Sequence, residues 1–407
     1  MANKKWKKEF YTLWSGQAFS VLSSSILQIA LIWHLTATTQ SAFVLSMASL
    51  AGFLPNAVLG MVAGTLVDRM NRKTVMVVAD LFIAAVSLML VVVSWNSELP
   101  IWFVIAVLAI RSVGTAFHSP TISAVTPLMV PTEELTKCAG YTQSLQTIGY
   151  MVGTAFAGIL YPILSISNMV FLDVAGALIA SGTVMAIKIP HLEKPAATKV
   201  KTSLWQEMKY GYVALRQEKG IFALVWIASA FMILYSPINA LFPLMSLDYF
   251  RGTTLQASLA EIAFSIGMLG GGVILGILGG IKNRGIGIPF LIALMGASIS
   301  ISGLLSENGF WVFTFLCITM GLSVPFYNGP VTALMQEKIL PEYLGRVFGL
   351  YGSIASFAMP IGLLISSSFA DSVGVNKWFF LSGVLIIGIA ALCLIIPSIR
   401  AIDKEVK

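Results

Sequence analysis

Gly64-Thr-Leu-Val-Asp68-Arg69-Met-Asn71-Arg72-Lys73 is a short charged stretch between two long apolar runs, residues 42–67 and 74–95. A membrane-spanning helix needs about 20 apolar residues, because its backbone must satisfy its own hydrogen bonds inside the hydrocarbon. Both flanking runs meet that length, and the stretch between them is too charged to lie in lipid. The sequence here predicts two membrane helices joined by a short loop.

The same alternation of apolar runs and polar breaks extends over the whole chain of 407 residues. Hydrophobic residues make up 57% of it and charged residues 11%, against about 25% charged residues in soluble proteins. A strand barrel is not expected, since barrel strands are segments of about ten residues with alternating polarity. We predict an all-α membrane protein with twelve spans, near 10–34, 42–67, 74–95, 100–121, 139–163, 168–189, 221–245, 255–280, 286–305, 309–331, 345–370 and 377–397.

The basic residues predict the orientation of these spans. If the N-terminus is cytoplasmic, 22 of the 25 Lys and Arg residues fall on the cytoplasmic side, as the positive-inside rule requires. The exceptions are Arg251, Lys377 and Arg111, and Arg111 lies inside a span. We therefore expect both termini in the cytoplasm. The net charge of +7 is attributed to this topology, so no nucleic-acid partner is expected.

A polar break near the middle of the chain divides it into two halves. We predict an N-terminal six-helix bundle over residues 1–190, a cytoplasmic linker over 191–220 and a C-terminal six-helix bundle over 221–407. Within the linker, the spacing of apolar residues in 203–216 favours a short amphipathic helix on the membrane surface.

Faint internal repeats relate the two halves. The segment Gly64–Arg72 aligns with Gly276–Arg284, and Thr126–Met129 aligns with Thr332–Met335, at offsets of 206 to 212 residues. Parallel repeats of this kind are typical of alternating-access transporters, in which two bundles surround a cavity near the membrane midplane.

The charged stretch itself resembles a loop motif of the major facilitator superfamily, G-x-x-x-D-R-x-G-R-K. Every motif position matches except Asn71, which replaces a glycine; asparagine tolerates left-handed backbone, so we expect the turn to survive. The resemblance implies two pseudo-symmetric six-helix bundles and a conformational gate at the motif residues Gly64, Asp68, Arg69, Arg72 and Lys73.

Several other stretches resemble the macrolide-efflux (Mef) proteins of Gram-positive bacteria. They are Leu45–Pro55, Arg111–His118, Leu135–Tyr141, Gly321–Tyr327 and Tyr343–Phe348. This likeness covers nearly the whole chain and implies proton-driven export of macrolide antibiotics through a bacterial cell membrane. The Gly-Pro pair that many drug antiporters carry in the fifth helix is absent from 149–158.

The chain contains no motif of an ATPase, a zinc protease or a serine hydrolase, so we do not expect an enzyme. The three scattered cysteines suggest neither a disulfide framework nor a metal site. We expect no cofactor, and a proton gradient as the energy source. Two alternatives remain: a carrier of the same fold for another amphipathic compound, such as a siderophore or metabolite, and a passive channel or membrane scaffold.

Ionisable groups inside a membrane are costly, so they are functional candidates by default. Arg111 lies near the middle of the fourth span, and Thr115 and His118 follow it at helical spacing. For proton coupling we place Glu261 first and Asp173 second, together with Arg111 and His118. Arg111 is alternatively interpreted as a lock between helices. Asp80 is interpreted as a partner of the nearby basic loop.

Polar and aromatic stripes predict the wall of a cavity for a large amphipathic drug. Interhelical hydrogen bonding is an equally good interpretation of any one of these residues. We expect the protein to act as a monomer in the lipid bilayer. The candidate cavity residues are Gln17, Ser24, Gln28, Gln143, Thr147, Tyr150, Phe231, Tyr235, Asn239, Phe326, Tyr327 and Asn328.

Overall fold

The computed structural model describes residues 2–67, 70–95, 98–131, 134–189, 204–278 and 280–403. Within these ranges the regular structure is entirely helical. Eleven of the helices found there are long and apolar enough to cross a membrane. A further helix, at the position of the fifth predicted span, has a shorter apolar part, Leu145–Leu160. The predicted all-α membrane architecture is thereby confirmed.

The chain divides into two compact units. Unit 1 takes in residues 1–40, 47–197 and 253–258. Most of its helices come from the first half of the chain: α1 (Ala2–Thr39), α2 (Ala42–Val67), α3 (Arg72–Ser94), α4 (Ile101–Met129), α5 (Leu135–Leu160) and α6 (Ile166–Ala186).

Unit 2 takes in residues 41–46, 198–252 and 259–407. Its elements are α7 (Leu204–Gln217), α8 (Lys219–Ala240), the π-helix η2 (Leu244–Tyr249), α9 (Thr254–Leu278), α10 (Arg284–Leu304), α11 (Phe310–Lys338), α12 (Pro341–Val373), α13 (Val375–Ile395) and α14 (Pro397–Arg400). The helix expected at 203–216 is α7. Most of the predicted linker before it, residues 190–203, lies outside the described residues.

The start of α3 shows why the charged stretch ends where it does. The Asn71 side chain accepts hydrogen bonds from the backbone N–H groups of Lys73 at 3.0 Å and Thr74 at 3.3 Å. It therefore caps the helix N-terminus, where backbone donors have no partner within the helix. Its φ of −72° and ψ of 108° are extended, so Asn71 does not need the left-handed backbone that its tolerance would have allowed.

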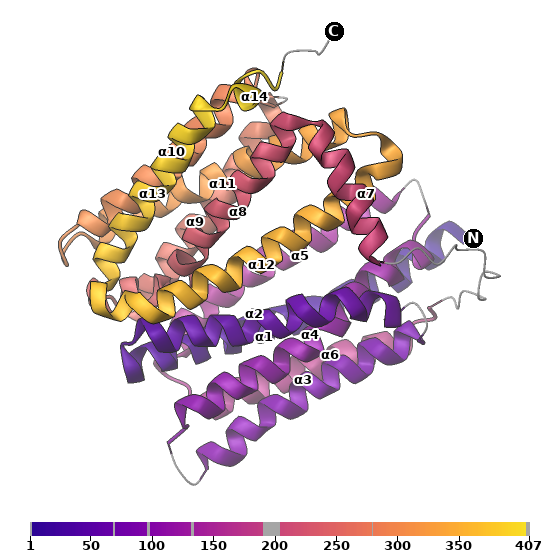
Figure 1. Cartoon of the computed structure of the whole chain (residues 1–407). Helices are drawn as coiled ribbons and strands as arrows, with labels where there is room; N and C mark the ends of the chain where they lie inside the picture. The colour runs from indigo at the N-terminus through magenta and orange to yellow at the C-terminus, as the bar shows by residue number, and fades with distance from the viewer. Residues whose placement is uncertain are drawn as a thin grey trace. The chain divides into compact units, whose positions relative to one another are not determined.

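Small residues set how closely the helices of unit 1 pack. Helix α6 lies beside α1 and α3, and Figure 1 shows α3 and α6 running side by side. At Gly176 of α6, an added Cβ atom would lie 2.0 Å from the Oγ atom of Ser23 in α1. Only a residue without a side chain fits there, which brings the polar faces of α1 and α6 together.

In unit 2 the helices α10 and α13 also pack closely through a glycine, and they lie side by side in Figure 1. A Cβ atom at Gly383 would lie 2.3 Å from Ser300 Oγ and 2.4 Å from the Ser300 backbone nitrogen. Helix α13 begins directly after Gly374, whose φ of +90° ends α12 in a conformation that side chains disfavour.

Candidate functional site

Unit 1 contains a cavity of about 300 Å³ lined by residues of α1, α2, α3, α4, α5 and α6. That volume is at the lower end of the range for sites that bind drug-sized molecules, about 300–1,000 Å³. Its wall is unusually polar for the interior of a membrane protein. The polar residues that line it are Gln17, Ser20, Ser24, Ser25, Gln28, Asp80, Arg111, Ser112, Thr115, His118, Ser119, Gln146 and Tyr150.

A buried ion pair joins α4 to α6 at this wall. The Arg111 guanidinium donates to Asp173 Oδ2 and to Ser87 Oγ. Ser24 Oγ donates to Asp173 Oδ1 at 2.6 Å, and Ser87 Oγ donates to Asp173 Oδ2 at 3.0 Å. Arg111 is 6% exposed and Asp173 1% exposed. Residues from three helices, α1, α3 and α4, thus satisfy both carboxylate oxygens of Asp173 on α6, which is the condition for holding a charge pair away from water.

A second pair of ionisable groups joins α3 to α4. His118 Nε2 lies 3.1 Å from Asp80 Oδ1, and both residues line the cavity. Asp80 therefore faces the histidine of α4, and its interpretation as a partner of the basic loop is wrong. Nothing in the spacing of 80 and 118 within the sequence indicates this contact, because it depends on the register of two neighbouring helices.

Uncharged side chains complete the wall. Gln17, Ser24, Gln28 and Tyr150, all predicted cavity residues, line it. Gln17 is 4% exposed, and neither atom of its amide has a hydrogen-bond partner among the described residues. Since buried amides are nearly always paired, this side chain has hydrogen-bonding capacity available for a molecule in the cavity.

The predicted face of α5 is shifted by part of a turn. Gln146 lines the cavity together with Tyr150, four residues later. Thr147 is half-buried and is not among the lining residues, and the side chain of Gln143 lies outside the described part of the structure. The spacing of 146 and 150 was visible in the sequence, but several overlapping polar stripes on α5 fit it equally well.

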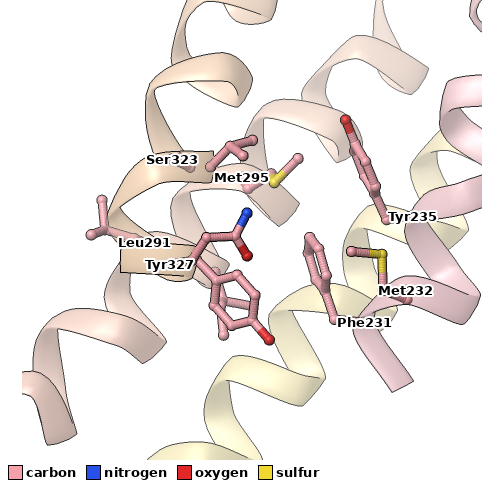
Figure 2. A pocket seen from close by; sticks show the side chains of 10 residues that line it. Phe231, Met232, Tyr235, Leu291, Met295, Ser323 and Tyr327 are labelled. Atoms are coloured by element: carbon pink, nitrogen blue, oxygen red, sulfur yellow. The ribbon is translucent and has the colours of Figure 1, made fainter. Parts of the chain in front are cut away.

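Unit 2 has a smaller pocket of about 50 Å³, bounded by α8, α10 and α11. Figure 2 shows the rings of Phe231 and Tyr327 and the thioethers of Met232 and Met295 around it. Phe231 stacks on Tyr235 with ring centroids 5.5 Å apart and lies 5.6 Å from the ring of Tyr327. The lining residues carry no formal charge, in contrast to the wall of the unit 1 cavity.

Four predicted cavity residues of the second half line this pocket, namely Phe231, Tyr235, Tyr327 and Asn328. Phe326 is buried and Asn239 is exposed, and neither is among the lining residues. Sequence reasoning missed Met232, Leu291, Ile292, Met295, Ser323 and Val324. Apolar residues in a membrane helix give no signal that separates a pocket wall from a lipid-facing surface.

Glu261, the first choice for proton coupling, lies half-buried on α9 in unit 2. It is an electrostatic neighbour of Cys317 on α11, and it lines neither the unit 1 cavity nor the unit 2 pocket. Arg111, Asp173 and His118, by contrast, belong to the charge network around the unit 1 cavity.

One gate residue, Lys73, holds two helix ends together. Lys73 Nζ donates to the carbonyl oxygens of Met185 at 2.7 Å and Ile187 at 2.8 Å. A cation is favoured at a helix C-terminus, where carbonyl groups lack partners, so Lys73 ties the start of α3 to the end of α6. Gly64 lies in α2, and Asp68 and Arg69 lie outside the described residues.

In unit 2, Arg284 stands where unit 1 has Arg72. Its guanidinium makes a two-point contact with Glu337, at 2.5 Å and 2.8 Å, and Asp403 accepts from the Arg284 backbone N–H at 2.6 Å. Asp403 thus accepts a hydrogen bond from a backbone N–H group at the start of α10, as Asn71 does at the start of α3. Unlike Asn71, Asp403 is distant in sequence from the helix that it caps.

Comparison with known proteins places this arrangement in a family. The sequence model of the Major Facilitator Superfamily matches residues 13–363. The chain belongs to the Major Facilitator Superfamily. It is therefore a multi-pass membrane transporter of small molecules and not an enzyme.

Among the relatives of this transporter is macrolide efflux protein A of Streptococcus pyogenes, 54% identical over 400 residues that cover 98% of each chain. Macrolide efflux protein A of Enterococcus faecalis is 54% identical over 323 residues, 79% of this chain and 99% of that one. A crystal structure of a variant of the peptide transporter POT has the same fold, with a TM-score of 0.71 at 14% identity over 98% of this chain and 96% of that one.

Proposed function

We propose that this transporter exports macrolide antibiotics from a bacterial cell and so confers resistance to them. The observation that carries the proposal is the 54% identity to macrolide efflux protein A of Streptococcus pyogenes, spread over 98% of both chains. A similarity of that extent includes the helices that line both pockets. The aligned region therefore includes the proposed transport path.

We further propose that export is driven by the proton gradient, as a drug/proton antiport, with no cofactor. The charged wall of the unit 1 cavity supports this coupling. Arg111 and His118 line the cavity, and Asp173 pairs with Arg111; groups of this kind in membrane helices are typical of proton relays. Glu261 stays a candidate on its own helix in unit 2.

The uncharged pocket of unit 2 is proposed to recognise the apolar part of the drug. Aromatic rings and methionine side chains bind apolar molecules well, and methionine adapts its shape to the ligand. The pocket of about 50 Å³ is smaller than a drug-sized ligand needs. Rotation of Met232 and Met295 is the proposed way in which it enlarges.

The transporter is proposed to act as a monomer in the cytoplasmic membrane, with both termini in the cytoplasm. The distribution of basic residues supports this orientation, since 22 of 25 fall on one side of the predicted topology. The gate motif, including Asp68 and Arg69, would then lie at the cytoplasmic face.

Expression in a host that lacks its own drug pumps tests the proposal. Cells that contain the transporter should accumulate less radiolabelled erythromycin than cells with an empty vector, and a protonophore should abolish the difference. The variant His34→Gln, altered outside both pockets, should behave as the wild type. Export that persists in the protonophore would exclude proton coupling.

The same experiment decides between macrolides and another amphipathic compound. Unchanged erythromycin accumulation, together with exclusion of a different labelled compound, would assign this transporter a different substrate on the same fold. The more distant relatives include a multidrug efflux pump, Tap of Mycolicibacterium fortuitum, 26% identical over 93% of each chain, so a panel of drugs is a suitable second probe.

A further inference from the structure

Asp80 is a buried carboxylate of unit 1 with an oxygen atom that accepts no hydrogen bond among the described residues. The residue is 3% exposed. Its Oδ1 atom lies 3.1 Å from His118 Nε2, but the two groups are not aligned for a hydrogen bond. Asp80 Oδ2 and His118 Nε2 both lack a hydrogen-bond partner among the described residues. A buried carboxylate normally has several partners, so this pair is open to a further proton or water in the cavity.

The neighbouring pair, Arg111 with Asp173, differs in this respect. Both oxygens of Asp173 accept hydrogen bonds, from Ser24, Ser87 and Arg111. A guanidinium also stays protonated at every physiological pH. The Arg111–Asp173 pair is therefore suited to hold helices and to supply a fixed local field, and it is poorly suited to exchange a proton.

The remaining groups that share the cavity with His118 are other residues of its wall. Helix α1 contributes Gln17, Ser20 and Ser24, and α5 contributes Gln146 and Tyr150. All of these are uncharged, and phenols ionise only at high pH. Asp80 on α3, Arg111 on α4 and Asp173 on α6 are the other charged groups in or next to the described wall.

We propose that the His118–Asp80 pair is the proton-binding site of the unit 1 cavity. This assignment rests on the proton-coupled export proposed above and names the site at which coupling occurs. Imidazole is the side chain whose unperturbed protonation changes between pH 5 and 8. The cavity of about 300 Å³ has room for the water molecules that bring and remove the proton.

The exchange step balances in charge and atoms. With His118 protonated, the two ion pairs together carry no net charge. The N–H bond at His118 then breaks, its electron pair stays on Nε2, and a cavity water takes the proton as hydronium. The Asp80 carboxylate is left without a counter-charge, which favours uptake of the next proton or of a positively charged ligand. Occupancy of the cavity by a ligand is thereby linked to the protonation of His118.

The test uses the full-length transporter in liposomes with radiolabelled erythromycin. Two assays run in parallel. The first measures accumulation driven by an imposed pH gradient. The second measures counterflow, in which unlabelled drug on one side exchanges for labelled drug on the other without an imposed pH gradient. The variants are His118→Gln and Asp80→Asn, and His34→Gln is the matched histidine control.

In the wild type and in His34→Gln, both assays should give transport. In His118→Gln and Asp80→Asn, gradient-driven accumulation should be lost while counterflow persists, because the drug still binds and crosses but no proton accompanies it. Wild-type protein should also release protons when erythromycin is added in weakly buffered detergent solution, and His118→Gln should not.

Several outcomes would overturn the assignment. Gradient-driven accumulation that survives in His118→Gln shows that the proton binds elsewhere, and Glu261→Gln then becomes the next variant. Loss of counterflow in both variants shows that the pair serves folding or drug contact. If the wild type shows counterflow but no accumulation driven by a pH gradient, the proton-coupled function itself is wrong, which is a separate result.

Discussion

The cavity of unit 1 and the pocket of unit 2 are built on related helices but have opposite chemistry. Arg72 and Arg284, the first residues of α3 and α10, set an offset of 212 residues between these helices, which places Ile292 where unit 1 has Asp80. Thr126 and Thr332 set an offset of 206 between α4 and α11, which places Val324 where unit 1 has His118.

Ile292 and Val324 both line the unit 2 pocket, as Asp80 and His118 both line the unit 1 cavity. The same offset places Cys317 where unit 1 has Arg111. Corresponding positions thus line both sites, while the side chains have become ionisable in one unit and apolar in the other. The comparison teaches that corresponding positions of the predicted repeat line a site in each unit, and that they are ionisable in the unit to which we assign proton exchange.

The largest expected effect comes from breaking the buried ion pair of unit 1. Asp173→Asn should destabilise the protein by about 3–5 kcal/mol, because Arg111 would keep a buried charge without its counter-charge. Thermal unfolding of the purified protein in detergent measures this. The double variant Arg111→Met with Asp173→Leu removes both charges and should lose much less stability. An Asp173→Asn protein as stable as the wild type would contradict the described network.

A smaller effect is expected where helices pack through glycine. Gly176→Val and Gly383→Val should each cost about 1–3 kcal/mol of unfolding free energy, because the new side chain overlaps Ser23 or Ser300. Gly182→Val and Gly388→Val are the controls on the same helices, since nothing lies within 4 Å of a Cβ atom there. Equal unfolding temperatures for all four variants would show that the close packing is not required.

A third variant asks whether unit 2 holds the apolar part of the drug. Phe231→Leu keeps an apolar side chain but removes the stacking on Tyr235 and the contact with Tyr327. We expect erythromycin to bind roughly 2- to 12-fold more weakly, since aromatic contacts contribute about 0.5–1.5 kcal/mol beyond their area. Equilibrium binding in detergent is the measurement. A greater loss in Gln17→Leu than in Phe231→Leu would move the main drug contacts to unit 1.

The smallest effect is expected at the exposed ion pair of unit 2. Glu337→Gln removes a two-point contact with Arg284, but the Glu337 side chain is 52% exposed. Exposed pairs contribute at most about 1 kcal/mol, so its unfolding temperature should differ little from that of the wild type. The difference should vanish at about 1 M salt, where screening acts within about 3 Å. A penalty as large as that of Asp173→Asn would remove the distinction between the buried and exposed pairs.

The sequence predicted those features that the membrane itself imposes. Long apolar runs became helices, because a backbone in hydrocarbon has few alternatives. The sequence identified Arg111, Asp173 and His118 as candidates because an ionisable group inside a membrane span is costly and usually has a function. The amphipathic spacing of 203–216 likewise predicted α7.

What the sequence left open depends on the rotation and register of helices against one another. The pairing of Asp80 with His118 needs the register of α3 against α4. The choice of Gln146 over Thr147 needs the rotation of α5, and one residue corresponds to about 100° of that rotation. The replacement of glycine by Asn71 was judged from the backbone alone, and the capping role of its side chain was not predicted.

The Arg111–Asp173 pair also constrains how the chain is made. The two residues are 62 positions apart, and a ribosome adds about 5–20 residues per second. Asp173 is therefore synthesised about 3–12 s after Arg111. During that interval α4 carries a charge without its counter-ion, which disfavours its release into lipid. The charge of Arg111 on α4 is neutralised only after α6 has been synthesised. A chain truncated before α6 should therefore fail to fold and be degraded by the cell.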